Sequence, residues 1–386
     1  MLGLVSLCMD LSSEIIHSVL PLYLAIGLGA SALTIGVVEG LAEAIALIVK
    51  VFSGVLSDVF RRRKPLVLLG YGLAAFTKII FPIAPTLAWI VTARFADRVG
   101  KGLRGAPRDA LIADIAPPDA RGASFGLRQA LDNVGAVAGP LVALAAMAHF
   151  HGDFQATFWV AVVPAFLAVA VIIFGVREPR RATGVDASRR MRIDVHAVRR
   201  LGGAYAAVVA IAAVLTLARF SEAFLILRAQ NVGLAPAQAP WIMVAMSLVY
   251  ALAAYPAGRA ADRGHAVALL HAGLWVLIAA DLVLARADAA WLVFAGGGLW
   301  GLHMGLTQGL FAAVVAASAP PDLRGTAFGV FNLVSGVALL LASALAGWSW
   351  DAHGPAATFV IGAGLTFVAW LAFLLRGGPS LDLRTS

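Results

Sequence analysis

Long apolar runs separated by short polar segments fill the chain. The runs at 66–82, 158–176 and 267–285 approach or reach the roughly 17–25 residues that cross the hydrocarbon core of a bilayer. Glycine and alanine are frequent in them, as is typical where helix backbones pack closely in lipid. The pattern predicts twelve membrane-spanning helices, near residues 2–28, 33–57, 65–85, 87–106, 121–148, 155–176, 203–228, 237–258, 265–285, 290–316, 323–347 and 355–376.

The first span could be confused with a secretory signal peptide, because Ala30, Ser31 and Ala32 resemble a cleavage site. However, no basic segment precedes this span, and Asp10 and Glu14 interrupt its apolar stretch. We therefore expect a retained first helix.

Composition supports an all-α integral membrane protein. Apolar residues make up 61% of the chain and charged residues 13%, against about 45–50% and about 25% in ordinary soluble domains. A long soluble chain of this composition would lack the polar residues to cover its surface. A multi-pass helical membrane protein is the class that remains.

Basic residues indicate the orientation of the spans. They gather in the short connections after even-numbered spans, and the segment 177–202 alone holds eight arginines. The positive-inside bias then predicts that both termini and this segment are cytoplasmic, in a bacterial inner (plasma) membrane. The net charge of +8 is thus a sign of topology. It does not indicate a nucleic-acid partner, which would need a basic soluble face.

Three pairs of similar segments suggest an internal duplication. Pro117–Gly126 (PPDARGASFG) returns as Pro320–Gly329 (PPDLRGTAFG), and two shorter pairs begin at Gly54 and Gly258 and at Ser13 and Ser221. A long repeat of this kind predicts two pseudo-symmetric six-helix bundles. We expect an N-terminal bundle at 1–176, a basic cytoplasmic linker at 177–202 and a C-terminal bundle at 203–386.

Each copy of the decapeptide has the features of a helix start. Paired prolines stop the preceding helix, and Asp119 or Asp322 is placed to cap the next one, whose N-terminus carries positive partial charge. The plain explanation is a repeated start signal. The alternative is that each start meets an acidic residue from the other bundle.

Twelve spans, two halves and a Gly-x-x-x-Asp segment before basic residues resemble the major facilitator superfamily of secondary transporters. In that family the loop motif after the second helix docks its Asp on a helix start in the opposite half and helps to close the cytoplasmic side. The resemblance implies such a gate here, with departures at Val59 and Arg61. Its predicted members are Gly54, Asp58, Arg62, Arg63, Gly258, Asp262, Arg263, Asp119, Arg121, Asp322 and Arg324.

A partial second motif lies in the fifth span. Gly135, Gly139 and Pro140 resemble the Gly-x-x-x-Gly-Pro motif of exporters that exchange drugs for protons, although Ala143 and Leu144 replace its trailing glycines. Close packing of a membrane helix on its neighbour explains the same residues equally well.

Polar residues inside spans are costly unless they are paired or hydrated, so they are the candidates for proton coupling and substrate binding. Asp10, Glu14 and His17 share one face of the first span by their spacing. The full set of candidates is Asp10, Glu14, His17, Glu39, Glu43, Lys78, Arg94, Arg128, Asp132, Glu222, His303 and Gln308. The alternative is that some form structural ion pairs only, as Arg128 with Asp132, or Asp97 with Arg94 or Lys101. Most of the chemistry is expected in the N-terminal half.

We therefore expect a secondary carrier that works by alternating access between two bundles. Proton-coupled efflux of a small organic solute is favoured, with a cation slightly preferred over an anion. Uptake by symport stays open. So does export of a divalent transition metal, because Asp, Glu and His facing one cavity suit such an ion.

No enzyme activity, cofactor or resident metal is expected. The sequence contains no phosphate-binding loop, no His-Glu-x-x-His and no nucleophile elbow. The expected partners are a small-molecule substrate, protons and the lipid bilayer, with the protein working as a monomer.

Overall fold

The computed structural model describes residues 1–59, 63–117, 120–178, 200–320 and 323–375, and the side chains of Asp58 and Arg324 also lie outside the description. All regular structure in these ranges is helical, which confirms the predicted fold class. The chain divides into two compact units, Met1–Gly29 with Leu41–Arg192, and Ala30–Gly40 with Ile193–Ser386. The predicted bundle boundaries at 176 and 203 stay a prediction.

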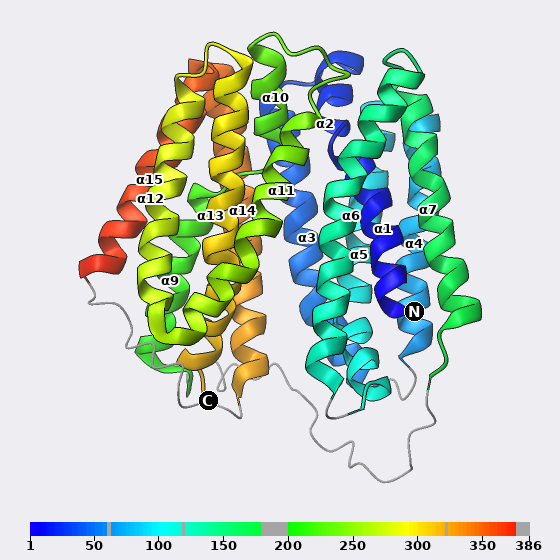
Figure 1. Ribbon diagram of the computed structural model, residues 1–386, viewed down its shortest axis with the longest axis vertical. Helices are drawn as coiled ribbons and strands as arrows, with labels where there is room; N and C mark the ends of the chain where they lie inside the picture. Colours follow the sequence, from blue (N-terminus) through cyan, green and yellow to red (C-terminus); the bar gives the residue numbers. More distant parts are fainter. Residues whose placement is uncertain (60–62, 118–119, 179–199, 321–322, 376–386) are drawn as a thin grey trace. The chain divides into compact units, whose positions relative to one another are not determined.

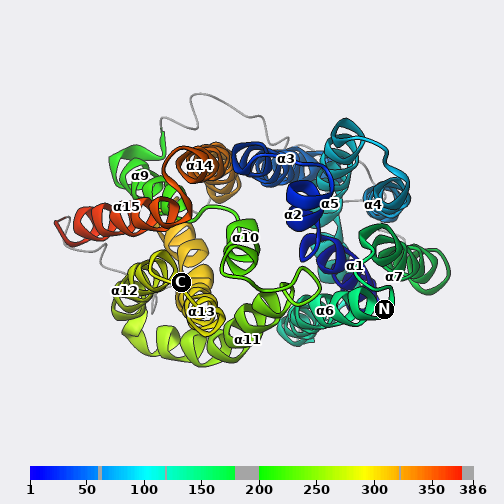
Figure 2. The ribbon, with the colours of Figure 1, turned by 90° about the horizontal axis from the view of Figure 1, so that it is seen from above.

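Long helices build the first unit in the part of the chain that the structure describes (Figure 1). In it α4 packs against α5 and α7, while α1 packs against α6 and α7. The arrangement of α1 beside α6 and α7 is visible in Figure 2. The helices are α1 (Leu2–His17), the C-terminal part of α3 (Ala32–Val59), α4 (Lys64–Ile83), α5 (Leu87–Ile115), α6 (Arg121–His149) and α7 (Phe154–Gly175).

The second unit repeats this packing. Its α12 packs against α13 and α15, as α4 does against α5 and α7, and its α9 packs against α14 and α15, as α1 does against α6 and α7. The shared plan supports the internal duplication. The helices are α9 (Gly202–Ala218), α10 (Ala223–Asn231), α11 (Trp241–Ala260), α12 (Ala266–Ala285), α13 (Ala290–Ser318), α14 (Arg324–His353) and α15 (Pro355–Leu375).

Nine helical segments of the described chain are long and apolar enough to cross a membrane. One of them, Trp241–Ala285, contains both α11 and α12, whereas α5 and α13 are not among the nine. The short stretch of α5 from Arg94 to Lys101 holds four charged side chains, which lowers its hydropathy. The helices are consistent with the twelve predicted spans.

Three predicted spans have a different form in the structure. The first span bends after His17, where Ser18 Oγ donates to the carbonyls of Glu14 and Ile15 at 2.8 and 3.1 Å. A three-residue helix, α2 (Leu20–Leu22), and a short π-helix, η1 (Tyr23–Gly27), follow the bend and complete the span. The seventh is broken between α9 and α10. The fourth continues past the predicted residue 106 to Ile115, with Pro107 inside the helix.

The helix α6 begins after Ala120 and α14 begins after Leu323. The predicted capping residues Asp119 and Asp322 lie outside the described residues, so their role as caps stays a prediction.

An unexpected cap starts α3. Asp351, on α14, accepts hydrogen bonds from the backbone N–H groups of Ala32 at 3.1 Å and Leu33 at 2.8 Å. Gly347 permits the approach, because a Cβ atom there would lie 2.6 Å from Leu33 Cα. The first third of α3 therefore groups with the second unit.

Candidate functional site

A ladder of buried ion pairs crosses the first unit. Lys78 Nζ on α4 lies 2.9 Å from Asp97 Oδ1 on α5, and it donates to Ser13 Oγ on α1 at 3.2 Å. Asp97 Oδ2 lies 3.9 Å from Arg98 Nε. Arg98 Nη1 in turn lies 2.7 Å from Glu43 Oε1 on α3. Alternating charges thus join three helices, α3, α4 and α5, and the hydrogen bond to Ser13 adds α1.

The ladder runs from the interior of the unit to an accessible face. The side chains of Lys78, Asp97 and Arg98 are 0%, 3% and 4% exposed, whereas Glu43 is 30% exposed. Lys101, 49% exposed, lies 4.0 Å from Glu43 Oε2. Asp97 thus has Lys78 and Arg98 close to it, because α4 packs closely along α5. Its expected pairing with Arg94 or Lys101 stays a prediction.

The acidic face of α1 lies next to this ladder. Glu14 Oε2 is 3.6 Å from His17 Nδ1, one helical turn away, and both side chains are partly buried. Asp10 lies one turn before Glu14, so the predicted shared face exists. Lys101 is within electrostatic range of both Asp10 and Glu14.

The glycines of the exporter-like motif hold this acidic face against α6. A Cβ atom at Gly135 would lie 3.1 Å from both Asp10 Cβ and Leu7 O. A Cβ atom at Gly139 would collide with Glu14 Cβ. Any larger residue at these positions would therefore push the acidic face of α1 away from α6. Gly135 and Gly139 on α6, with Asp10 and Glu14 on α1, therefore form one contact between the two helices, the α1–α6 seam.

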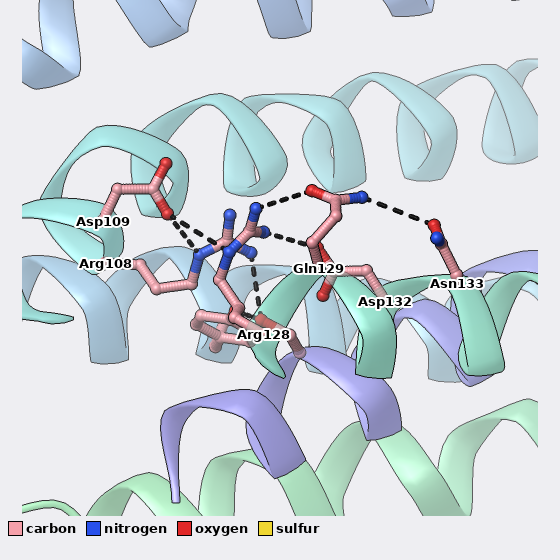
Figure 3. Close-up of polar contacts among 8 residues, drawn as sticks. Arg108, Asp109, Arg128, Gln129, Asp132 and Asn133 are labelled. Carbon is pink, nitrogen blue, oxygen red and sulfur yellow. Dashed lines mark hydrogen bonds and ion pairs between the residues drawn. The ribbon is translucent and has the colours of Figure 1, made fainter. Parts of the chain in front are cut away.

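A second polar network joins α5 to α6 near the start of α6, as Figure 3 shows. Arg128 pairs with Asp132, as the spacing predicted, and donates to Gln129 Oε1 at 2.8 Å. Its Nε lies 3.9 Å from Asp109 Oδ1, and Arg108 Nε donates to the same oxygen at 3.0 Å. This network stabilises the contact between the two helices.

The same network continues into the core of the first unit. Arg108 Nη1 donates to Ser6 Oγ on α1 at 3.1 Å, and Ser6 Oγ lies 3.5 Å from Tyr71 Oη on α4. The Arg104 guanidinium lies over the Tyr71 ring, 4.7 Å from its centroid. A cation over an aromatic ring is attracted by the ring quadrupole.

The other predicted site residues are scattered. Arg94 is fully buried on α5, and Glu39 is buried on the part of α3 that groups with the second unit. In the second unit, Glu222 is the N-cap residue of α10, and Gln308 is exposed on α13. His303 is buried, with Nδ1 2.8 Å from the carbonyl oxygen of Gly273.

The predicted gate is only partly described. Arg63 Nη1 lies 2.9 Å from Asp114 Oδ2, and the Arg63 N–H donates to Glu178 Oε1 at 2.5 Å. A Cβ at Gly54 would contact Ala106, whereas Gly258 borders open space. Three further members are exposed: Arg121, Asp262 and Arg263. Outside the description lie Arg62, Asp119 and Asp322 and the side chains of Asp58 and Arg324, so docking of Asp58 and Asp262 on helix starts stays a prediction.

Among the described residues, no three His, Cys, Asp or Glu side chains come together in a way that could hold a metal ion. Asp10, Glu14 and His17 therefore do not form a ready metal site in this conformation.

Several site residues were not singled out from the sequence. The sequence predicts Asp97 only as a member of a structural ion pair and does not single out Arg98. Ser6, Ser13 and Tyr71 give no signal, because hydroxyl groups are common in membrane helices. Their roles depend on which helices are neighbours. The charge of Asp97 inside a predicted span is the feature of the sequence that indicates a polar site in this unit.

Comparison with known proteins identifies the class of this carrier-like fold. Residues 2–228 and 203–385 match the family model described as Major Facilitator Superfamily. The chain belongs to the major facilitator superfamily and is a multi-pass membrane transporter.

Its relatives agree with this assignment. The chain is 31% identical over 383 residues to the uncharacterized MFS-type transporter MJ1317 of Methanocaldococcus jannaschii, covering 97% of this chain and 93% of that relative. It is 31% identical over 353 residues to the uncharacterized protein Rv2265 of Mycobacterium tuberculosis, covering 90% and 85%. A shorter match to the multidrug resistance protein MdtH of Citrobacter koseri is 32% identical over 117 residues and covers 30% and 28%.

Solved structures share the fold. A mutant of the nucleoside transporter NupG superposes with a TM-score of 0.80 at 13% identity, covering 97% of this chain and 98% of that one. A POT family transporter in complex with 5-aminolevulinic acid superposes with a TM-score of 0.78 at 13% identity, covering 97% and 94%. At these identities the likeness shows the fold alone.

Proposed function

We propose that this transporter is driven by protons and exports a small organic solute in exchange for them. The observation that carries the proposal is the α1–α6 seam, in which Gly135 and Gly139 hold Asp10 and Glu14 against the exporter-like helix. The partial similarity to a multidrug resistance protein supports export. We further propose that the transporter works as a monomer in an inner membrane, with both termini cytoplasmic.

The proposed mechanism uses the titratable face of α1. Asp10 and Glu14 hold protons in one conformation and give them up in the other, and substrate occupies the same region when they are ionised. A ligand shifts the two conformations only through its different affinity for each. Asp10 and Glu14 carry the preference for a cationic substrate, because Glu43 already has Arg98 as an ion-pair partner at 2.7 Å.

The test begins with a stabilisation screen of purified protein against organic cations, organic anions and divalent metals. A compound that binds the folded state raises the melting temperature, and the rise grows with the ratio of its free concentration to its dissociation constant. The best binder is then added to everted membrane vesicles that have an acidic interior. Exchange releases the internal protons, whereas symport does not, so the readout separates export from uptake.

Variants assign the coupling residues. Glu14→Gln and Asp10→Asn should each abolish proton release while the protein still folds and inserts. Asp288→Asn, in the exposed connection between α12 and α13, is the matched control and should behave as wild type. Full proton release in both α1 variants would overturn the proposal.

A further inference from the structure

Asp281 is the most isolated buried acid of the second unit. It lies on α12, one turn before that helix ends at Ala285, and it is 0% exposed. Neither carboxylate oxygen has a hydrogen-bond partner among the described residues. Buried polar groups are nearly always hydrogen-bonded, so an isolated one requires an explanation.

The surroundings of Asp281 are apolar and tightly packed. A Cβ atom at Gly362 on α15 would lie 2.8 Å from Asp281 Oδ2 and 2.9 Å from Phe220 Cε1, so the acid and the ring edge border the same small space. The Phe220 ring packs on Phe224, Trp300 and Phe359, with centroids 5.5, 5.2 and 5.6 Å away.

The charged and titratable groups on the neighbouring elements are engaged elsewhere. Arg228 on α10 donates to the carbonyls of Leu284, Ala285 and Ala287 at the end of α12. His271 on α12 packs on Trp370 and Phe373, and His303 on α13 contacts the Gly273 carbonyl. Arg219 and Glu222, which flank Phe220, interact with each other. The sequence of α15, Pro355–Leu375, contains no titratable residue.

An ionised carboxylate in this position would be very costly, because no described donor or cation compensates for its lost hydration. A neutral carboxylic acid fits the same space at far lower cost. The packing around Asp281 therefore favours the form that holds a proton.

Phe220, whose ring borders the same space as Asp281, lies in the break of the seventh span between α9 and α10. Helix α9 ends at Ala218 and α10 begins at Ala223, and Arg219 has φ −104° and ψ 78°. Two side-chain hydrogen bonds hold the break, from Ser221 N–H to Ser343 Oγ at 3.1 Å and from Ala223 N–H to Ser221 Oγ at 3.2 Å. Helix ends leave backbone groups without helical partners, so such a break changes conformation with few bonds lost.

We propose that Asp281 is a proton-binding site of the second unit, closed by Phe220 and opened by movement of the α9–α10 break. When the break moves and water enters, the carboxylic acid transfers its proton to water and leaves a hydrated carboxylate. When the break closes, the carboxylate must take up a proton before it is buried again. The inference rests on the proposed proton coupling and adds a second site on the opposite unit from Asp10 and Glu14.

The direct test is infrared spectroscopy of purified protein across a range of pH. At neutral pH the wild type should show the C=O stretching band of a buried protonated carboxyl group. That band should be missing in Asp281→Asn and unchanged in Asp288→Asn. An identical band in wild type and Asp281→Asn would overturn the proposal. This readout needs no substrate, so it stands even if proton-driven transport is not found.

A second pair of variants tests the closure by Phe220. Gly362→Ala places a methyl group between Asp281 and Phe220, whereas Gly364→Ala on the same helix enters open space. The first variant should change the pH at which the band disappears, and the second should not. Equal behaviour of the two variants would contradict the role of this space.

Transport measurements then test the coupling role. A gradient of one pH unit supports about tenfold accumulation for each coupled proton. Asp281→Asn should lower accumulation about tenfold under that gradient and leave substrate exchange without a gradient intact. Normal accumulation in Asp281→Asn would show a protonated acid without a coupling role, and that outcome overturns the proposal.

Discussion

The two units share one packing plan but place their polar groups in opposite ways. The first unit is crossed by alternating charges from Lys78 to Glu43. At the corresponding place the second unit has a cluster of aromatic rings around Phe220 and one isolated acid, Asp281. The two units thus share their contacts between helices, whereas the side chains inside them differ. Helix packing depends on small residues and shape, which many side chains satisfy, whereas a charge needs a particular partner.

This difference suggests separate tasks for the two units. A ladder of paired charges can pass a change at one end to the other, because each member compensates for its neighbours. An isolated carboxyl group among aromatic rings has two states only, protonated or ionised. The variants below test whether the two units differ in this way.

The largest effect is expected from breaking the buried pair of the first unit. Lys78→Met removes the partner that lies 2.9 Å from the buried Asp97, and removing one partner of a buried pair costs about 3–5 kcal/mol. The double variant Lys78→Met with Asp97→Leu should recover most of this loss. Unfolding of detergent-purified protein measures both. The control is Asp109→Asn at the more exposed pair, where a change of at most about 1 kcal/mol is expected.

In the second unit the corresponding test is Arg228→Met. The guanidinium donates to carbonyls of Leu284 and Ala287 at 3.0 and 2.7 Å, and hydrogen bonds of a charged group contribute about 1.5–3 kcal/mol. The free energy of unfolding should fall by that amount. Arg286→Met, an exposed neighbour, should have little effect. Equal losses for the two arginines would mean that the carbonyl contacts do not stabilise this unit.

A smaller effect on stability is expected at the α1–α6 seam. Gly139→Ala adds one methyl group that collides with Glu14 Cβ, and overpacking of this kind typically costs about 1–3 kcal/mol. Transport should suffer more than stability, because the acidic face of α1 is displaced. Gly126→Ala, whose Cβ would meet nothing within 4 Å, is the matched control. Wild-type transport by Gly139→Ala would show that transport does not depend on the contact between the exporter-like glycine motif and the acidic face of α1.

The smallest effect is expected at the start of α3. Asp351→Asn keeps an oxygen acceptor for only one of Ala32 and Leu33, because the two N–H groups use different carboxylate oxygens. It also removes the negative charge at a helix N-terminus, which contributes about 0.3–1 kcal/mol. The melting temperature of purified protein should fall slightly and the difference should shrink in high salt. A loss that does not depend on salt would point to the hydrogen bonds instead.

The fold was more predictable than the site. Apolar runs predict membrane helices directly, because the length of a run and the thickness of a bilayer are simple quantities. The break at Arg219–Glu222 was missed, since an apolar run such as 203–228 looks the same whether its helix is continuous or interrupted. The end of the fourth span was misplaced because Arg104 and Arg108 look like loop residues until their partners are known.

Among the site residues, contacts within one helix were easier to predict than contacts between helices. Contacts within one helix, such as Arg128 with Asp132 and Glu14 with His17, were predictable from spacing. Contacts between helices were not, as the pairing of Asp97 with Lys78 shows. The isolation of Asp281 depends on what three other elements fail to provide, and no local pattern in the sequence reports it.

The cap on α3 also has a consequence for the order in which the protein is made. The N–H groups of Ala32 and Leu33 receive their acceptor from Asp351, a residue that the ribosome adds 319 positions after Ala32. Until then the first turn of α3 lacks this acceptor. The start of an early helix is thus completed by a residue from one of the last helices to be synthesised.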